Sequence, residues 1–448
     1  MLDCAIIGAG LAGLVAARDL RNRGLGVVVL EARDRVGGRI ENGVLADGQY
    51  VELGGQWIGA GHDAIFDLVE RYGLRTIGIP AQGNLVVRVH GRLLEVPSAQ
   101  DGEELTPFEV ADLSQGLLRL RRLAHRLADD PAWVAANEAW LQQNLRRWVR
   151  TNLRTGGAQA RFGEVYEAAF GTMAPDATLL EGLRQINSGP SLETMIANNG
   201  GLNQQRVDGG MAALCEALAA DLGDAVRLGN AVTRIGHGDV ASVTLASGET
   251  IEARTVISTL PPRLAVALEY DPPLPQWRLD VAQRVAPGNV IKAYLVYETP
   301  FWRERGLSGQ SSSDEGAVRV TFDTTLAASE RGLLMGFFEG NEAGSLAARP
   351  FEDRQRAFIE SAIRAFGSEA AKPVEYVERD WTAEQYTRGC HGAHFAPGIW
   401  TSSGPVLAAP DGCLYWAGAE YSTKFNGYME GAVRSAEEVA ATVALALI

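Results

Sequence analysis

The N-terminal residues contain a glycine pattern that can hold a phosphate group. Gly8, Gly10 and Gly13 form the sequence GAGLAG after an apolar segment, residues 4–7. Gly8 would permit a tight turn, Gly10 a close approach of a pyrophosphate to the backbone, and Gly13 close packing of a helix on a strand. A helix that begins here directs unpaired N–H groups and its positive dipole end towards an anion.

Glu31 lies where such a pattern requires a carboxylate for a ribose hydroxyl. It ends a second apolar segment, residues 27–30, and follows Gly13 by 18 residues, close to the usual spacing of about 20. We therefore predict a strand over 4–7, a helix over 14–23 and a strand over 27–30. This order is typical of a Rossmann-like α/β dinucleotide-binding unit, but it does not distinguish NAD from FAD.

The next residues suit a long diphosphate ligand. Arg33 and the sequence Gly37-Gly38-Arg39 follow Glu31 directly, and a second glycine pair stands in YVELGGQWIG, residues 50–59. Glycine pairs leave bare backbone for a ligand, and arginines can pair with phosphates. Taken alone, these residues are equally explained by a surface arginine cluster and two turns.

Composition excludes several classes of protein. The chain has 448 residues, of which 46% are hydrophobic and 21% charged, so extended disorder and collagen are excluded. A net charge of −14 argues against a basic nucleic-acid-binding surface. The four cysteines are far apart and form no CxxC pair, so we expect neither a disulfide framework nor a zinc site. No apolar stretch reaches about 18 residues and no signal peptide is evident, so we expect a cytoplasmic protein without a membrane span.

Seven blocks in order resemble the flavin amine oxidases, a family that includes monoamine oxidases and bacterial cyclic-amine and polyamine oxidases. They are EARDRVGGR with YVELGGQWIG, NGG with VDGG (199–210), VISTLPP (256–262), VIK with PFW (290–302), Trp381 to Cys390 with FAPG, YWAGAE (415–420) and GYMEGAV (427–433). The resemblance covers most of the chain. It implies an α/β fold with a Rossmann-like FAD domain (1–81, 190–281 and 384–448), interleaved with an α+β substrate domain (82–189 and 282–383).

The resemblance also implies which residues bind FAD. Cys390 matches a cysteine that binds flavin covalently in some relatives, but non-covalent FAD is favoured here because bacterial relatives often lack the bond. The remaining positions are Gly8, Gly10, Gly13, Glu31, Ala32, Arg33, Gly38, Arg39, Gly54, Gly55, Gln56, Trp57, Val232, Trp381, Gly418, Glu420, Tyr428, Met429 and Ala432.

Three residues are implied in catalysis. Lys292, in the apolar segment VIKAYLV, would hold a water against flavin N5 and assist the reaction with O₂. Tyr428 would form one wall of an aromatic cage around the substrate amine. The second wall would be a tyrosine in well-known relatives, but this chain has His391, which is smaller and can titrate. Gln185 and Trp57, with His391 and Tyr428, would line the substrate pocket. No carboxylate or third ligand accompanies His391 and His394 in a motif, so no metal site is predicted.

The implied activity is oxidation of a monoamine, alicyclic or aralkyl, to an imine by hydride transfer to flavin N5. Hydrolysis would give an aldehyde or ketone plus ammonia, and O₂ would be reduced to H₂O₂. The stretch 55–58 carries no arginine to clamp a carboxylate, which disfavours an amino acid. L-amino-acid, polyamine, carotenoid or porphyrinogen oxidoreductases of the same fold are alternatives, as is a non-catalytic protein of the GDP-dissociation-inhibitor type. We expect amine and O₂ as partners and no nucleic acid, and a homodimer is left open.

Two further patterns predict local structure. Residues 106–186 lack strand-like runs and predict several helices, with Trp133, Trp140 and Trp148 on one helical face at separations of 7 and 8. Residues 232–252 predict a small antiparallel sheet with a turn at Ser247-Gly248.

Overall fold

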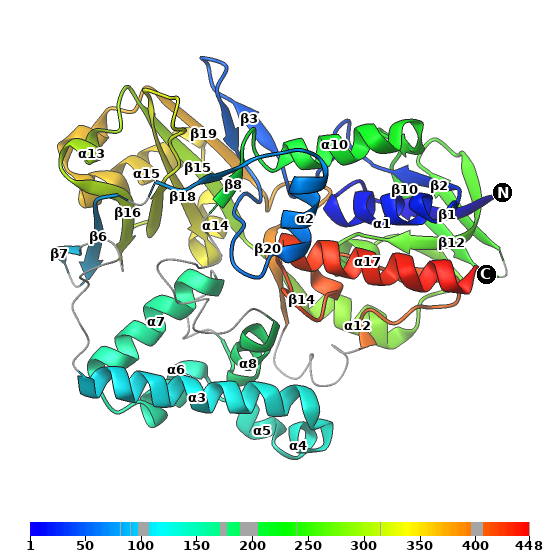
Figure 1. Ribbon diagram of the computed structural model, residues 1–448, viewed down its shortest axis with the longest axis horizontal. Helices are drawn as coiled ribbons and strands as arrows, with labels where there is room; N and C mark the ends of the chain where they lie inside the picture. Colours follow the sequence, from blue (N-terminus) through cyan, green and yellow to red (C-terminus); the bar gives the residue numbers. More distant parts are fainter. Residues whose placement is uncertain are drawn as a thin grey trace.

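The computed structural model of the chain describes residues 1–80, 82–89, 91–96, 107–170, 177–188, 205–238, 240–313, 315–395 and 406–447. Figure 1 shows a large sheet and its helices at one end of the molecule and a second sheet at the other end. A group of helices lies below the second sheet. Mixed helices and sheets of this kind confirm the predicted α/β class.

The first sheet has eight strands in the order β13-β10-β11-β12-β1-β2-β9, with β21 also paired to β12. Its strands are β1 (Leu2–Ile7), β2 (Val27–Leu30), β9 (Val226–Arg227), β10 (Val232–His237), β11 (Ala241–Leu245), β12 (Thr250–Ser258), β13 (Glu269–Asp271) and β21 (Leu414–Trp416). β1 pairs in parallel with both β2 and β12, and its last four residues are buried. Parallel strands buried on both faces explain the continuous apolar runs in the sequence.

Strand β12 has two different partners on one side. Its first half pairs antiparallel with β11, and its second half pairs in parallel with β21, where Val256 lies opposite Leu414. The small antiparallel sheet predicted for 232–252 therefore exists as β10, β11 and β12, but it is part of the large sheet. The sequence pattern could not reveal this, because β21 lies more than 150 residues further along the chain.

Helices α1 (Leu11–Asn22), α10 (Ala212–Leu222) and α17 (Met429–Ala446) lie side by side next to this sheet (Figure 1), and α1 contacts the other two. Their apolar residues share one buried cluster with β1, β2 and helix α2 (Asp63–Arg71). Helices α11 (Pro262–Ala265) and α12 (Gln276–Arg284) follow β12.

The second sheet has the order β19-β15-β18-β17-β16-β6-β7. Its strands are β6 (Asn84–Val89), β7 (Arg92–Val96), β15 (Val290–Tyr297), β16 (Leu307–Ser313), β17 (Val320–Asp323), β18 (Gly332–Glu339) and β19 (Glu375–Asp380). Helices α13 (Phe301–Glu304), α14 (Gly340–Ala347) and α15 (Phe351–Phe366) accompany it. Every residue of β15 is buried. β18 and β19 pair with its two edges, and its two faces pack in two different apolar clusters.

Three pairs of short strands join other parts of the chain. They are β3 (Asn42–Val44) with β4 (Tyr50–Glu52), β5 (Thr76–Gly78) with β8 (Gln205–Val207), and β14 (Val285–Gly288) with β20 (Cys390–Phe395). The large sheets combine separated chain segments, which supports two interleaved domains; their boundaries stay a proposal.

The remaining helices are α3 (Pro107–Asp129), α4 (Pro131–Ala136), α5 (Glu138–Leu141), α6 (Leu145–Asn152), α7 (Gly156–Phe170) and α8 (Leu179–Ser188). The prediction that Trp133, Trp140 and Trp148 share one helical face is wrong, since they lie on three different helices. Asp130 and Asn144 accept hydrogen bonds from backbone amides three residues on and so start new helices. Trp148 is buried, whereas Trp140 is 41% exposed.

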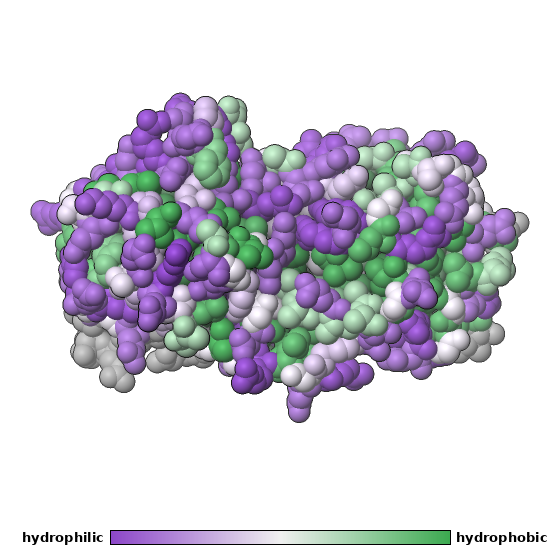
Figure 2. Space-filling view, turned by 90° about the horizontal axis from the view of Figure 1, so that it is seen from above, coloured by the Kyte–Doolittle hydropathy of each residue, from purple (hydrophilic) through white to green (hydrophobic). Residues whose placement is uncertain are grey.

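The face shown in Figure 2 carries mainly hydrophilic side chains with hydrophobic ones in small patches between them. Among the described residues, none of the helices combines the length and the apolar character needed to span a bilayer.

Candidate active site

The glycine loop after β1 has the geometry that its sequence predicts. Gly8 has φ +100° and donates its N–H to the carbonyl of Leu30 at 2.8 Å. A Cβ on Gly13 would lie 1.9 Å from the carbonyl oxygen of Gly8, so only glycine allows α1 to pack this closely. Gly10 precedes the first residue of α1, and that helix has no side-chain cap and no acidic residue in its first turn. Its first N–H groups are therefore suited to an anion.

A second glycine loop lies against the first. Gly37 donates its N–H to the carbonyl of Ala9 at 2.8 Å. A Cβ on Gly10 would meet nothing nearer than Cα of Gly38, at 3.9 Å. Packing within the protein therefore does not require glycine at position 10. The bare backbone there fits the close approach of a ligand, as the fingerprint predicts.

Glu31 follows β2 and is 4% exposed. Its carboxylate accepts hydrogen bonds from the amide of Ala9 at 2.8 Å and from that of Arg33 at 3.0 Å. The Arg33 side chain bridges Glu31, at 3.4 Å, and Glu384, at 3.1 Å. The predicted ribose carboxylate thus lies next to the glycine loop, with Ala32 beside it. Val232 begins β10.

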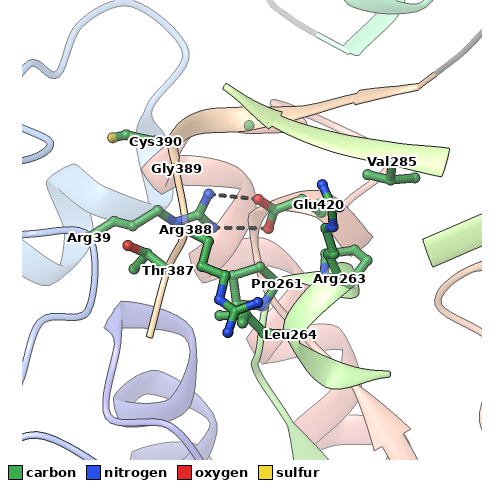
Figure 3. Close-up of a pocket in the computed structure, with 12 residues that line it drawn as sticks. Arg39, Pro261, Arg263, Leu264, Val285, Thr387, Arg388, Gly389, Cys390 and Glu420 are labelled. Atoms are coloured by element: carbon green, nitrogen blue, oxygen red, sulfur yellow. Dashed lines mark hydrogen bonds and ion pairs between the residues drawn. The ribbon is translucent and has the colours of Figure 1, made fainter. Parts of the chain in front are cut away.

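Arg39 and Glu420 come from segments 381 residues apart and form a two-bond ion pair. The guanidinium nitrogens lie 2.6 and 2.9 Å from the two carboxylate oxygens, and Glu420 is buried. In Figure 3 the two side chains point towards each other across a pocket that Cys390, Arg388 and Arg263 also line. Gly418, just before Glu420, has φ +137°, a conformation that favours glycine.

The glycine pair 54–55 joins this region to the last helix. A Cβ on Gly54 would lie 2.1 Å from the carbonyl oxygen of Arg39, and one on Gly55 would lie 2.9 Å from Sδ of Met429. Met429 begins α17, which also carries Ala432. The structure therefore brings the early and the closing motifs together.

Lys292 is a buried lysine at the third position of β15, with 3% exposure. Its Nζ donates to the carbonyl of Gly54 at 2.9 Å and makes a short hydrogen bond to Oε1 of Gln56. Burial lowers the pKa of Lys292 to about 7, although the charge of Glu52 opposes that shift. Among the described residues, no carboxylate forms an ion pair with Lys292.

Tyr428 directly precedes α17 and is half-buried. Its ring centroid lies 6.3 Å from that of Phe425 and 6.0 Å from that of His62. Burial raises the pKa of the Tyr428 phenol, so the phenol is neutral at pH 7. Phe425 has φ +50°, a strained conformation for a residue with a side chain.

His62 was not predicted from the sequence. It is 1% exposed, and its Nδ1 accepts the N–H of Gly59 at 3.2 Å. That bond assigns the hydrogen to Nε2, which is buried without a partner among the described residues. Burial lowers the pKa of His62 to about 4, so its ring is neutral beside Phe425 and Tyr428.

Two predicted tryptophans flank the Lys292 region. The ring of Trp57 packs edge-on against Phe322 at 4.8 Å and Phe337 at 6.2 Å, and its Nε1 is buried without a partner among the described residues. Trp381 is fully buried and donates from Nε1 to the carbonyl of Leu53 at 2.8 Å.

Cys390 begins β20, and its thiol is partly exposed in the pocket of Figure 3. Gln185 and His391 belong to α8 and β20, but their side chains lie outside the described part of the structure, as does the sequence Asn199-Gly200-Gly201. Their predicted roles therefore stay predictions. Within the described residues, no group of three His, Cys, Asp or Glu side chains is placed to hold a metal ion.

Glu52 and Arg206 are buried charges near Lys292 that sequence reasoning missed. Glu52 is 2% and Arg206 4% exposed, and their charged groups lie 3.6 Å apart. A carboxylate inside the apolar alternation of YVELGG could have indicated Glu52. Arg206 lies in the three-residue strand β8, where no motif marked it.

The described geometry agrees with comparisons to known proteins. The family model of flavin containing amine oxidoreductases matches residues 11–444. A Mycobacterium tuberculosis protein, provisionally named flavin-containing monoamine oxidase AofH, is 35% identical over the whole chain and 97% of its own length. Putrescine oxidase bound to putrescine matches with a TM-score of 0.89 and 30% identity over 99% of this chain and 98% of its own. Cyclohexylamine oxidase from Brevibacterium oxydans matches with a TM-score of 0.88 and 28% identity, over 100% of this chain and 99% of its own.

The glycine loops, the buried acid of β2 and the closing motif on α17 define a flavin-dependent oxidoreductase of the amine oxidase fold. The chain belongs to the family of flavin containing amine oxidoreductases. It is an amine oxidase, and its cofactor is FAD. The residues present fit this cofactor: the bare backbone at Gly10 and the uncapped N-terminus of α1 suit its pyrophosphate, and Nε2 of Gln56 is a buried donor without a partner among the described residues.

Proposed function

We propose that this enzyme oxidises small amines without a carboxylate, alicyclic or aralkyl, to imines, which hydrolyse to an aldehyde or ketone plus ammonia while O₂ becomes H₂O₂. The observation that carries the proposal is the Lys292 nitrogen. It lies on β15, a strand that is buried along its whole length, and it is held by hydrogen bonds to Gly54 and Gln56. A lysine in such a place is costly unless it serves a function.

When bound, FAD would supply the chemistry for accepting a hydride equivalent from the amine and for reducing O₂. In the proposal, the amides at the start of α1 hold its pyrophosphate and Glu31 accepts from its ribose. Arg39, fixed by Glu420, keeps a positive charge near the phosphates. The start of α17 at Met429 stabilises negative charge near its first turn.

Lys292 holds a water molecule in position for the reaction with O₂. Its partners Gly54 and Gln56 fix Nζ in one place, and burial excludes other water. Trp381 fixes the neighbouring backbone through its bond to Leu53.

Tyr428 and His391 flank the substrate amine, and Trp57 and Gln185 line the pocket around it. The neutral amine is the form that reacts, and a site walled by aromatic rings disfavours the charged ammonium through desolvation. The rings of His62 and Phe425 support Tyr428 from behind.

Amines without a carboxylate are favoured because the stretch 55–58 provides no arginine. The likeness to cyclohexylamine oxidase supports an alicyclic amine, whereas the likeness to putrescine oxidase supports the polyamine alternative. A polyamine would additionally call for a carboxylate at the far end of the pocket, and the four predicted pocket residues, Gln185, Trp57, His391 and Tyr428, include none.

One residue favours a second candidate, an L-amino-acid oxidase. Arg184 lies on α8, the helix that packs in one apolar cluster with Phe425 and Tyr428. Burial lowers the pKa of Arg184 to about 9, although the charge of Glu181 on the same helix opposes that shift. A substrate carboxylate would be a second anion for this guanidinium.

A panel of amines and the matching L-amino acids, with peroxide detection, tests both candidates. Cyclohexylamine and phenethylamine should exceed L-phenylalanine in kcat/KM by more than about tenfold, which corresponds to about 1.4 kcal/mol. A higher value for the amino acid, lost in an Arg184→Met variant, would establish the second candidate.

A further inference from the structure

Two short segments face each other across the Lys292 region. On β15, Lys292 and Tyr294 are two residues apart and therefore point to the same side of the strand. Tyr294 donates its hydroxyl hydrogen to the carbonyl of Glu52 at 2.6 Å, and the same hydroxyl lies 3.2 Å from Oε1 of Gln56. Since Lys292 bonds to Gly54 and Gln56, positions 52, 54 and 56 all face β15.

The carboxylate of Glu52 is enclosed within this contact. Its Oε1 accepts the N–H of Met211 at 2.9 Å. Its Oε2 lies 3.6 Å from a nitrogen of Arg206 and accepts no hydrogen bond from the part of the chain that the structure describes. Arg206 is fixed in turn by a bond to the carbonyl of Thr324 at 3.1 Å. Glu52 is thus held in one place, and its interaction with Lys292 acts through space. Burial raises the pKa of the Glu52 carboxyl, while the charges of Lys292 and Arg206 and the hydrogen bond from Met211 lower it and favour the carboxylate.

The two hydrogen bonds of Lys292 use two of the directions around Nζ, and a third direction has no assigned hydrogen-bond partner among the described residues. The carbonyl of Gly54 and Oε1 of Gln56 are both acceptors, so each needs an N–H from Lys292. An ammonium has a third N–H for the remaining direction, whereas a neutral amine has a lone pair there. The protonation state of Lys292 therefore decides whether a donor or an acceptor points in that direction.

Three groups act electrostatically on Lys292 from the elements around it, and a fourth, Tyr294, faces it without a charge. Glu52 on β4 and Cys390 on β20 raise its pKa, Arg206 on β8 lowers it, and Tyr294 on β15 is neutral because burial raises its phenol pKa far above 10. Burial is the largest effect and brings the pKa of Lys292 to about 7.

We propose that Glu52 is a positioning residue for Lys292: its buried charge, balanced by Arg206, sets whether the third direction of the lysine nitrogen carries a hydrogen-bond donor or a lone pair. The inference rests on the proposed function, in which that direction faces the water beside the flavin. The donor form orients this water by its oxygen, and the lone-pair form by its hydrogen.

Two charge-removing variants of opposite sign test the inference in the FAD-loaded enzyme. Glu52→Gln removes the anion and Arg206→Gln removes the cation, and both keep hydrogen-bonding groups. The matched control is Glu378→Gln, which removes a buried carboxylate paired with Arg354. Glu378 lies opposite Ala293 in the register of β15 and β19, so it faces away from Lys292.

Two measurements are made against pH: the rate of reoxidation by O₂ in a stopped-flow instrument, and the equilibrium reduction potential of the flavin by spectroelectrochemistry. The wild type should show an inflection near pH 7 that is absent in Lys292→Met. In Glu52→Gln the inflection should move down by about one pH unit, and in Arg206→Gln it should move up by a similar amount. The control should leave it in place.

An unmoved inflection in both charge variants, shifts of the same sign, or an inflection that persists in Lys292→Met would each overturn the inference. If Glu52→Gln fails to fold, the upward shift in Arg206→Gln decides alone. Loss of the yellow flavin absorbance on adding an amine without O₂ checks the proposed function separately. If the absorbance is lost but the inflection does not move, only the role of Glu52 is refuted. If the absorbance of the wild type does not change, the proposed function is refuted.

Discussion

The carboxylate of Glu430, in the first turn of α17, caps the start of helix α2 through the amide of Ile65. One oxygen accepts that N–H at 3.0 Å, and the other accepts the N–H of Ala64 at 3.1 Å and Nε of Arg434 at 2.7 Å. Glu430 is completely buried. The helix that the closing motif begins therefore also fixes the helix that follows the early glycine pair.

Glu430→Gln should lower the stability of the enzyme. Both carboxylate oxygens of Glu430 accept backbone N–H groups, and the variant replaces one of these oxygens by an NH₂ group, which is itself a donor. We expect a loss of about 1–3 kcal/mol in the free energy of unfolding. Thermal unfolding of the purified protein measures it, with the exposed Glu438→Gln on the same helix as the control. Equal melting temperatures for the two variants would contradict the capping role.

Gly13→Ala should prevent FAD binding. The added Cβ would lie 1.9 Å from the carbonyl oxygen of Gly8, so α1 or the loop has to move away. The purified variant should lack flavin absorbance. Gly163→Ala is the control, because Gly163 is also helical and a Cβ there meets nothing within 4 Å. A fully yellow Gly13→Ala protein would refute the assigned glycine role.

Arg39→Lys should weaken FAD binding by about tenfold to a hundredfold, since lysine cannot reproduce the two parallel bonds to Glu420. Equilibrium dialysis against free FAD measures the change. Arg227→Lys removes a similar two-bond pair with Glu249 at an exposed site and should leave affinity unchanged. Comparable losses in both variants would point to a general loss of stability.

The buried Lys292 should make stability depend on pH. Its pKa is about 7 in the folded protein against 10.5 for the free side chain, so between these values the unfolded chain binds more protons. Stability should therefore rise with pH across this window, by up to about 1.4 kcal/mol per pH unit, relative to Lys292→Met. Urea unfolding of both proteins at pH 7 and pH 9 tests the sign. A difference between the proteins that stays constant from pH 7 to pH 9 would show that Lys292 titrates normally.

Acid precipitation should release the flavin into a yellow supernatant, because we favour non-covalent FAD. The thiol of Cys390 is partly exposed in the pocket, so a covalent bond remains the alternative outcome. A yellow pellet that turns colourless in Cys390→Ala would establish that bond.

Much of the cofactor region could be predicted because its residues are constrained locally. Gly8 and Gly13 are required by backbone geometry, and the strand and helix around them follow from apolar runs and a helix start. The position of Lys292 as a charge in an apolar strand is visible in the sequence, but its catalytic role is implied only by the family resemblance. These signals need no knowledge of distant contacts.

Other features depend on contacts between remote segments and left no local signal. The pair of Glu52 with Arg206 forms only when β4 and β8 come together, and His62 is buried by the Phe425 loop. The tryptophan spacing misled because a regular separation says nothing about the breaks between the three residues. These breaks lie at Asn137, between α4 and α5, and at Asn144, whose side chain caps the start of α6.

The two-partner strand β12 has a consequence for biosynthesis. Its second half is paired on one side by β21, which is followed at once by Gly418 and Glu420, the partner of Arg39. A nascent chain that has already made the glycine loop still lacks a strand of that sheet and the carboxylate that orients Arg39. We therefore expect the polypeptide to take up its flavin late, after the ribosome has added the residues of β21 and Glu420.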